Sequence, residues 1–173
     1  LHLYEYNFVS NNETQLTNGK SDDAAPKFSP DGKFLAFIRD GKEIRKLDWK
    51  TKKETLVTKA NISLPIFANA SSYSWSPDGR WIAYTAQQVK SFANLHIVSA
   101  NGGQVRSASF LANSSSGNVT WSKNSKYILY STTQRTENRV IARVDLVKQI
   151  PKFREEQIQK MFTDPLTATP ATP

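Results

Sequence analysis

The two histidines, His2 and His96, are the side chains of this chain best suited to acid–base or metal chemistry near neutral pH. Each lies in an alternating strand pattern, and the two are far too distant in sequence to form a ligand pair. Because the chain has no cysteine, it can form neither a thiolate metal site nor a disulfide. We interpret both histidines as strand-edge or surface residues, and we predict no metal-binding or cofactor-binding residues.

A serine nucleophile would need a strained Gly-x-Ser-x-Gly elbow between a strand and a helix. None of the glycines opens such a motif. The seven glycines are Gly19, Gly32, Gly41, Gly79, Gly102, Gly103 and Gly117. The sequence therefore predicts no catalytic residues, and we expect this segment not to be an enzyme.

Four aspartates remain as candidate ligands. Asp22 and Asp23 follow Lys20 and could bind a cation or a substrate amine, although a solvated turn is the ordinary interpretation of such a run. Asp31 and Asp78 each occur within Ser-Pro-Asp-Gly, where aspartate bonds to its own backbone in a type I turn. We interpret this second pair as turn formers.

Five Asn-x-Ser/Thr sequons are present. They begin at Asn12, Asn61, Asn69, Asn113 and Asn118. Such sequons carry glycans only in a eukaryotic secretory pathway, and chance accounts for them in a chain so rich in serine, threonine and asparagine. They give no functional prediction.

The chain of 173 residues carries a net charge of +8, from 23 Lys and Arg against 15 Asp and Glu. An electrostatic affinity for anionic partners follows, but the basic residues are spread out without a dense run, so nucleic-acid binding is not predicted. No apolar stretch is long enough to span a bilayer, which predicts a soluble segment. The pattern leaves open whether its compartment is the periplasm or the cytoplasm of a bacterium.

One decapeptide pattern, written three times, organises the chain. The copies at residues 28–37, 75–84 and 121–130 start 47 and 46 residues apart. Each copy has an aromatic residue and a turn, followed by a strand that is apolar on both faces and must therefore be covered on both faces. A period of this length is typical of β-propeller blades, which cover one another in this way. A hairpin in a β-sandwich is the alternative, and the near-constant spacing disfavours it.

We therefore predict an all-β chain that forms a partial β-propeller of about three blades of antiparallel strands over residues 1–147. An incomplete blade covers residues 1–19, where a turn at 11–13 joins strands at 1–9 and 14–17, and repeats start near residues 25, 72 and 118. The predicted strands of these repeats are 27–29, 34–39, 43–48 and 54–57; 73–76, 81–86, 94–99 and 104–107; and 118–121, 127–132 and 139–146. Residues 148–163 are predicted to form a short helix, and residues 164–173 an extended, flexible Thr/Pro tail or linker.

Fewer than four repeats fit in this length, whereas a closed propeller needs at least four blades. We therefore expect a fragment of a larger protein, or an oligomer that covers the open blade edges. The first interpretation is favoured, since residue 1 falls within a strand pattern.

The motif at residues 75–84, with Asn94–Val98 and Gly102-Gly103 after it, resembles the WD-like repeats of the TolB propeller and of prolyl oligopeptidase, dipeptidyl peptidase and tricorn relatives. Residues 143–148 and 151–157 resemble a segment of the propeller region in bacterial tricorn-like serine peptidases. The resemblance implies a non-catalytic propeller that guides, gates or docks polypeptide for a peptidase domain beyond residue 173. The alternative is a TolB-like propeller that binds a partner protein and has no attached catalysis.

Overall fold

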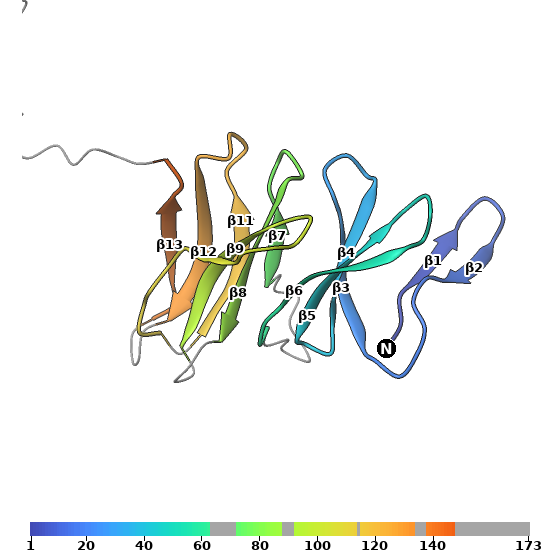
Figure 1. Cartoon of the computed structure of the whole chain (residues 1–173), viewed down its shortest axis with the longest axis horizontal. Coiled ribbons are helices and arrows are strands. Elements are labelled where there is room, and N and C mark those ends of the chain that lie inside the picture. The colour runs from blue at the N-terminus through green and yellow to red at the C-terminus, as the bar shows by residue number, and fades with distance from the viewer. Residues whose placement is uncertain (63–71, 88–91, 114, 134–137, 148–173) are drawn as a thin grey trace, which may run out of the picture.

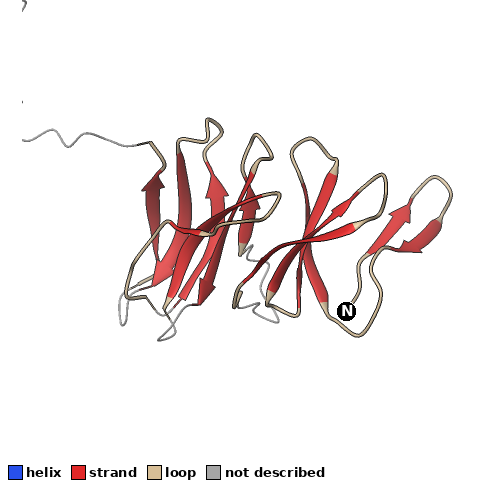
Figure 2. Cartoon of the chain, in the orientation of Figure 1, coloured by secondary structure: helices blue, strands red, loops and turns tan. Residues whose placement is uncertain are grey.

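The computed structural model describes residues 1–62, 72–87, 92–113, 115–133 and 138–147, and these residues form strands and loops without a helix (Figure 2). The strands are β1 (Tyr4–Asn7), β2 (Asn12–Gln15), β3 (Asp23–Phe28), β4 (Phe34–Arg39), β5 (Glu43–Asp48), β6 (Glu54–Lys59), β7 (Tyr73–Trp75), β8 (Trp81–Gln87), β9 (Ala93–Ser99), β10 (Arg106–Ser107), β11 (Ser115–Trp121), β12 (Tyr127–Thr133) and β13 (Val140–Asp145).

The strands form four antiparallel sheets, each built from strands that follow one another in sequence. The hairpin β1–β2 is followed by the four-stranded sheets β3–β4–β5–β6 and β7–β8–β9–β10 and by the three-stranded sheet β11–β12–β13. These sheets stand one after another in a row, from the β1–β2 hairpin to β13 (Figure 1). This arrangement is a partial β-propeller of about three blades, as the spacing of the repeats predicts. We refer to the three larger sheets as blades 1, 2 and 3.

The central strand β4 of blade 1 is buried on both faces. Leu35 and Phe37 pack with Leu3, which precedes β1, in one apolar cluster. The alternate residues Ala36 and Ile38 belong to a different cluster, shared with blade 2. The two-faced apolar pattern of the decapeptide is thus explained by a neighbour on each side, as in a propeller.

The same division recurs in blade 2. Ile82 and Tyr84 of β8 face blade 1, whereas Ala83 faces blade 3, where it packs with Ile128 and Tyr130. Each of these aliphatic and aromatic side chains is at most 1% exposed. The core of the chain is therefore a series of seams between blades.

Hydrogen bonds across the seams repeat with the blades. The indole Nε1 of Trp75 donates to the carbonyl oxygen of Lys27 at 3.2 Å, and that of Trp121 donates to the carbonyl oxygen of Ser74 at 3.1 Å. Each acceptor lies one residue before the position equivalent to the tryptophan in the preceding blade. The aromatic residue of the decapeptide therefore sets the register between blades.

The Ser-Pro-Asp-Gly turns are held by the hydroxyl group of their serine. In blade 1, Ser29 Oγ donates to Asp31 Oδ1 at 2.6 Å and accepts from the backbone N–H of Phe34 at 3.0 Å. Ser76 makes the same pair of bonds with Asp78 and Trp81 in blade 2. Both aspartates are turn formers, as predicted from the sequence.

The third copy of the turn keeps the geometry but lacks the glycine. Ser125 stands at the glycine position with φ of 56°, close to the 71° and 69° of Gly32 and Gly79. A residue with a side chain is strained by about 1 kcal/mol in this left-handed region. The degraded motif of blade 3 is therefore a local source of instability.

We expect Ser125→Gly to raise the free energy of unfolding by about 0.5–1 kcal/mol, because glycine relieves the strain at positive φ. Urea denaturation of the whole chain measures this change. The reverse substitution, Gly79→Ser, is the matched control and should lower stability by a similar amount, since a Cβ there meets its nearest neighbour, Pro30 Cδ, at an ordinary 3.7 Å. A stability gain from Gly79→Ser would contradict this account of the turn.

Some predicted limits differ from the structure. The limits of β4 and β5 agree with the prediction, but the turn of the first hairpin occupies residues 8–11 rather than 11–13. Asn11, which has φ of 55°, is the last residue of this turn rather than its first. The predicted helix at 148–163 and the tail at 164–173 lie outside the described residues, as do most of the connections at 59–72, 87–92 and 134–138.

Candidate functional site

Asp23 lies in a buried ion pair, so the prediction of a solvated turn at Asp22 and Asp23 is wrong for this residue. Its side chain is fully buried and receives two hydrogen bonds from the guanidinium group of Arg39, at 2.7 and 2.9 Å. The hydrogen bonds with Asp23, and secondarily those with Glu54, raise the pKa of Arg39. Asp23 thus joins the first two strands of blade 1, and Arg39 occupies both of its oxygens.

A network of further charges extends from this pair across blade 1. Glu54 accepts from Arg39 at 2.9 Å and lies 3.3 Å from Arg45, which also pairs with Glu43 at 2.7 Å. Lys59 also pairs with Glu43, at 3.3 Å, so three carboxylates and three cations from four adjacent strands balance one another. The network therefore connects strands and offers no free carboxylate for catalysis.

His96 is buried in β9, so the interpretation of this histidine as an edge or surface residue is wrong. Its side chain packs beside the ring of Tyr84 at 5.5 Å, and Nδ1 lies 3.3 Å from the hydroxyl of Ser107. Nε2 is buried and has no hydrogen-bond partner within the described residues. Burial lowers the pKa of His96 below its ordinary value, so the ring is neutral near pH 7.

We expect the chain to lose stability as the pH falls below about 6.5, the ordinary pKa of a histidine. The unfolded chain binds a proton at His96 more tightly than the folded chain does, so the contribution is complete above that pH and is lost towards the lower folded pKa. Urea midpoints of the native chain and of His96→Gln, measured between pH 5 and pH 7.5, test this. Parallel pH profiles for the two proteins would rule out His96 as the cause.

The remaining candidate residues are His2 and the sequon residue Asn113, and each has a side-chain atom that is buried within the fold. His2 is partly exposed, and its Nδ1 is buried without a hydrogen-bond partner among the described residues. Asn113 of one sequon is fully buried and donates to Ser116 Oγ and Thr132 Oγ1, both at 2.6 Å. The folded chain therefore cannot accept a glycan at Asn113.

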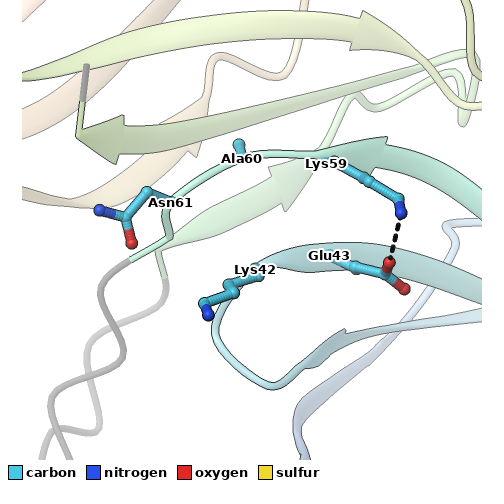
Figure 3. Close-up of a pocket in the computed structure, with 5 residues that line it drawn as sticks. All are labelled: Lys42, Glu43, Lys59, Ala60 and Asn61. Atoms are coloured by element: carbon cyan, nitrogen blue, oxygen red, sulfur yellow. Dashed lines mark ion pairs between the residues drawn. The ribbon is translucent and has the colours of Figure 1, made fainter. Parts of the chain in front are cut away.

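One surface pocket lies at the end of blade 1 where β4 turns into β5 (Figure 3). It is lined by Lys42, Glu43, Lys59, Ala60 and Asn61. Lys59 and Glu43 form an ion pair at 3.3 Å on one wall, and the Lys42 ammonium lies apart from it (Figure 3). This pocket is shallow, and the Lys42 ammonium at its rim is available to a partner.

A second pocket, with a volume of about 370 Å³, lies at the seam between blades 1 and 2. Blade 1 contributes Phe34 and Lys46, and blade 2 contributes Trp81 and Asn101 together with the second Ser-Pro-Asp-Gly turn. Lys46 lies in an ordinary strand pattern, so the sequence alone does not indicate this pocket. Only the register of β5 against its neighbours reveals that its ammonium enters a seam.

The first strands of the three blades, β3, β7 and β11, lie next to one another, and each is an edge strand of its sheet. Trp75 and Trp121 bond across neighbouring first strands, and β3, β7 and β11 each pair with a single neighbour inside the sheet. Two of these strands contain a bulge with a residue at positive φ, Ala25 at 54° and Asn118 at 50°. The bulges and Pro26 interrupt the edge, so pairing with an added strand is restricted to its regular parts.

Across the described ranges, no group of three His, Asp or Glu side chains is placed to hold a metal ion. Nor does this part of the chain contain a helix with the length and apolar character that crossing a membrane requires.

Comparison with known proteins identifies a family. The model of the dipeptidyl peptidase IV (DPP IV) N-terminal region matches residues 2–104, which is more than half of the chain. No curated protein matches the chain.

Solved structures with similar folds include a TolB protein, the tricorn protease and a dipeptidyl peptidase. TolB from Acinetobacter baumannii shares 16% identity at a TM-score of 0.63, covering 84% of this chain and 35% of that one. The tricorn protease shares 14% identity at a TM-score of 0.60, covering 97% of this chain and 17% of that one. Dipeptidyl peptidase 4 from Porphyromonas gingivalis shares 17% identity at a TM-score of 0.58, covering 83% and 27%. The chain thus spans about a third or less of each, and these likenesses establish the propeller fold.

Proposed function

The chain belongs to the family of the dipeptidyl peptidase IV N-terminal region, and on this premise we propose that it is a non-catalytic propeller segment that guides, gates or docks polypeptide for a serine peptidase. The peptidase would be tricorn-like or prolyl-oligopeptidase-like and part of the same longer protein. In this proposal residues 1–147 form the propeller part, 148–163 a helix and 164–173 a linker.

The adjacent first strands carry this proposal. The indole hydrogen bonds join β3 to β7 and β7 to β11, so these three strands lie side by side. An extended polypeptide can bind along the surface that they form. Backbone N–H and C=O groups on such an edge bind an extended chain with little dependence on its sequence. A segment that handles many polypeptide substrates needs this kind of recognition.

A TolB-like role, in which one face holds a folded partner protein, is supported by a different observation. The tip of the β1–β2 hairpin exposes Phe8 and Val9 at 90% and 98%, with Tyr4 and Tyr6 about half exposed. Contiguous exposed apolar side chains are typical of protein-interaction sites. The two proposals therefore use different surfaces of the chain.

Binding to unfolded and folded forms of one protein distinguishes the two roles. We expect the chain to bind reduced, carboxamidomethylated lysozyme in a fluorescence anisotropy titration and to bind native lysozyme at least about tenfold more weakly, because only the unfolded form can lie extended along the strand edges. Equal binding to both forms, or to neither, would overturn polypeptide docking. Loss of unfolded-lysozyme binding in Phe8→Ser would assign the contact to the hairpin tip instead.

We expect this segment by itself to hydrolyse no peptide bonds. The carboxylates of the charged network are paired with arginines, and His96 is enclosed by its own blade, so these groups are not placed to act on a substrate. Incubation with unfolded lysozyme, followed by mass spectrometry, measures cleavage. Turnover that disappears in His96→Ala would overturn the non-catalytic assignment.

A further inference from the structure

Lys46 is the only lysine or arginine that is buried in the described part of the chain. Lys46 is 9% exposed, and its Nζ contacts Asn101 Oδ1 at 2.8 Å and the ring of Phe34 at 4.5 Å from the centroid. Within the described residues no carboxylate lies within ion-pair distance of this nitrogen. Lysine is almost never buried to this extent without a counter-ion, because burial removes its hydration.

The nearby carboxylate of Asp48 does not fill this role. Its Oδ1 accepts hydrogen bonds from the backbone N–H groups of Lys50 and Thr51, at 3.0 and 2.8 Å, which hold it in the turn after β5. Asp48 contributes only a secondary attraction to Lys46, and burial is the larger effect, which lowers the pKa of the ammonium. An anion from outside the chain can therefore still act as the counter-ion.

Blade 3 shows what the same position looks like with its counter-ion. Arg143 pairs with Leu129 as Lys46 pairs with Ala36, and it lies over the ring of Tyr127 as Lys46 lies over Phe34. Arg143, however, pairs with Asp145 at 2.7 Å. Asp48 occupies the place of Asp145 opposite the aromatic residue, but it is bonded to the turn backbone, so Lys46 keeps the cation and the ring of this arrangement without the ion pair.

Blade 2 shows that the position does not need a charge. Its equivalent residue is Ile97, which pairs with Ala83 and packs in the seam between blades 2 and 3. Packing of a seam therefore does not require a cation at this place. The one hydrogen bond from Lys46 to Asn101 leaves the other donors of its ammonium group available to a ligand in the pocket.

The pocket beside Lys46 supplies a second cation. Arg80 lines the same pocket and uses its Nε to bond Asp78 at 2.7 Å, while its two terminal nitrogens make no hydrogen bond to the described residues. A planar carboxylate fits such a guanidinium fork in a bidentate manner. Phe34 and Trp81 form apolar walls for the carbon atoms that carry the carboxylate.

We infer that the seam pocket between blades 1 and 2 binds a carboxylate of a peptide, with Lys46 and Arg80 as its cationic ligands and Asn101 holding Lys46. The carboxylate is either the terminal group of a chain or the side chain of an acidic residue. The peptide source of this carboxylate rests on the proposed function, whereas the anion site itself stands on the geometry of the seam.

Calorimetric titration with three N-acetylated tripeptides tests the site. The probes are Ala-Ala-Ala with a free terminal carboxylate, Ala-Glu-Ala amide, and the neutral Ala-Gln-Ala amide as reference. We expect one or both charged peptides to bind at least about tenfold more tightly than the neutral one, in a salt-dependent manner. The charged peptide that binds more tightly identifies the source of the carboxylate.

The variants follow from the comparison of the blades. Lys46→Ile copies blade 2 and should fold, and it should lower the affinity for the charged peptide by about tenfold or more. Arg80→Gln removes an exposed charge from the same pocket and should also weaken binding, while Lys42→Met removes an equal charge from the other pocket and should leave it unchanged.

Three results would overturn the assignment: no binding of either charged peptide, wild-type affinity in both Lys46→Ile and Arg80→Gln, or displacement of the peptides by an oligothymidylate that binds more tightly. The last result would identify phosphate as the ligand. Binding of unfolded lysozyme to Lys46→Ile separates this site from the proposed function, because polypeptide docking along the strand edges does not require the seam pocket.

Discussion

Replacing Trp75 with alanine is expected to lower the free energy of unfolding by about 3–5 kcal/mol, the range for truncating a large aromatic side chain in a core. Trp75 is 7% exposed and packs between blades 1 and 2, in a cluster with Ile38 and Ile82. The substitution removes this packing and also the indole hydrogen bond to the carbonyl of Lys27. Urea denaturation followed by circular dichroism measures the loss.

Trp121→Ala is the matched comparison, since the two tryptophans are equivalent in the repeat and are expected from the sequence alone to cost the same. In the structure Trp121 is only partly buried, at the edge of its cluster. We therefore expect a smaller loss of about 2 kcal/mol for Trp121→Ala. Equal losses for the two variants would show that packing across the seams is not what distinguishes the blades.

The parts of the fold that the sequence predicts correctly are those determined by local chemistry. The Ser-Pro-Asp-Gly turns and the limits of β4 and β5 follow from turn residues and from apolar patterns within a few positions. The stacking of blades follows from one further step, because a strand apolar on both faces needs two neighbours. Repetition of the pattern made that step reliable.

The burial and the contacts of the charged and polar residues in the candidate sites cannot be predicted from the sequence. Asp23 and its neighbour Asp22 look alike in the sequence, but only Asp23 points back towards Arg39, 16 residues later. His96 and Lys46 occupy ordinary strand positions, and their burial depends on residues of another strand or blade. Side-chain direction in these places is set by register and bulges, which no local pattern encodes.

An alignment of the three repeats nevertheless indicates the position of Lys46. Lys46, Ile97 and Arg143 occupy equivalent places in the three blades, so a comparison of the repeats shows a basic residue where blade 2 has an apolar one. The comparison becomes informative only once the pairing partners of these residues are known. Repeats therefore give the scaffold directly and the sites only through the pairing of strands.

Asp23→Ala is expected to lower the free energy of unfolding by about 3 kcal/mol, at the lower end of the range for breaking a buried ion pair. The substitution leaves Arg39, whose side chain is only 15% exposed, without its bidentate partner. The loss stays at the lower end because Glu54 still accepts from Arg39 at 2.9 Å. Asp22→Ala is the matched control, and it should change stability by less than about 0.5 kcal/mol, since that side chain is 70% exposed.

A double-mutant cycle of Asp23→Ala and Arg39→Ala separates the ion pair from the rest of each side chain. We expect the double variant to be less destabilised than the sum of the single variants by about 1–3 kcal/mol, because removing Arg39 also removes the buried charge that Asp23→Ala leaves unpaired. Additive losses would mean that the two side chains stabilise blade 1 independently. In that case the contact between β3 and β4 would depend on backbone pairing and packing, and the charged network would be a consequence of the fold rather than a cause of its stability.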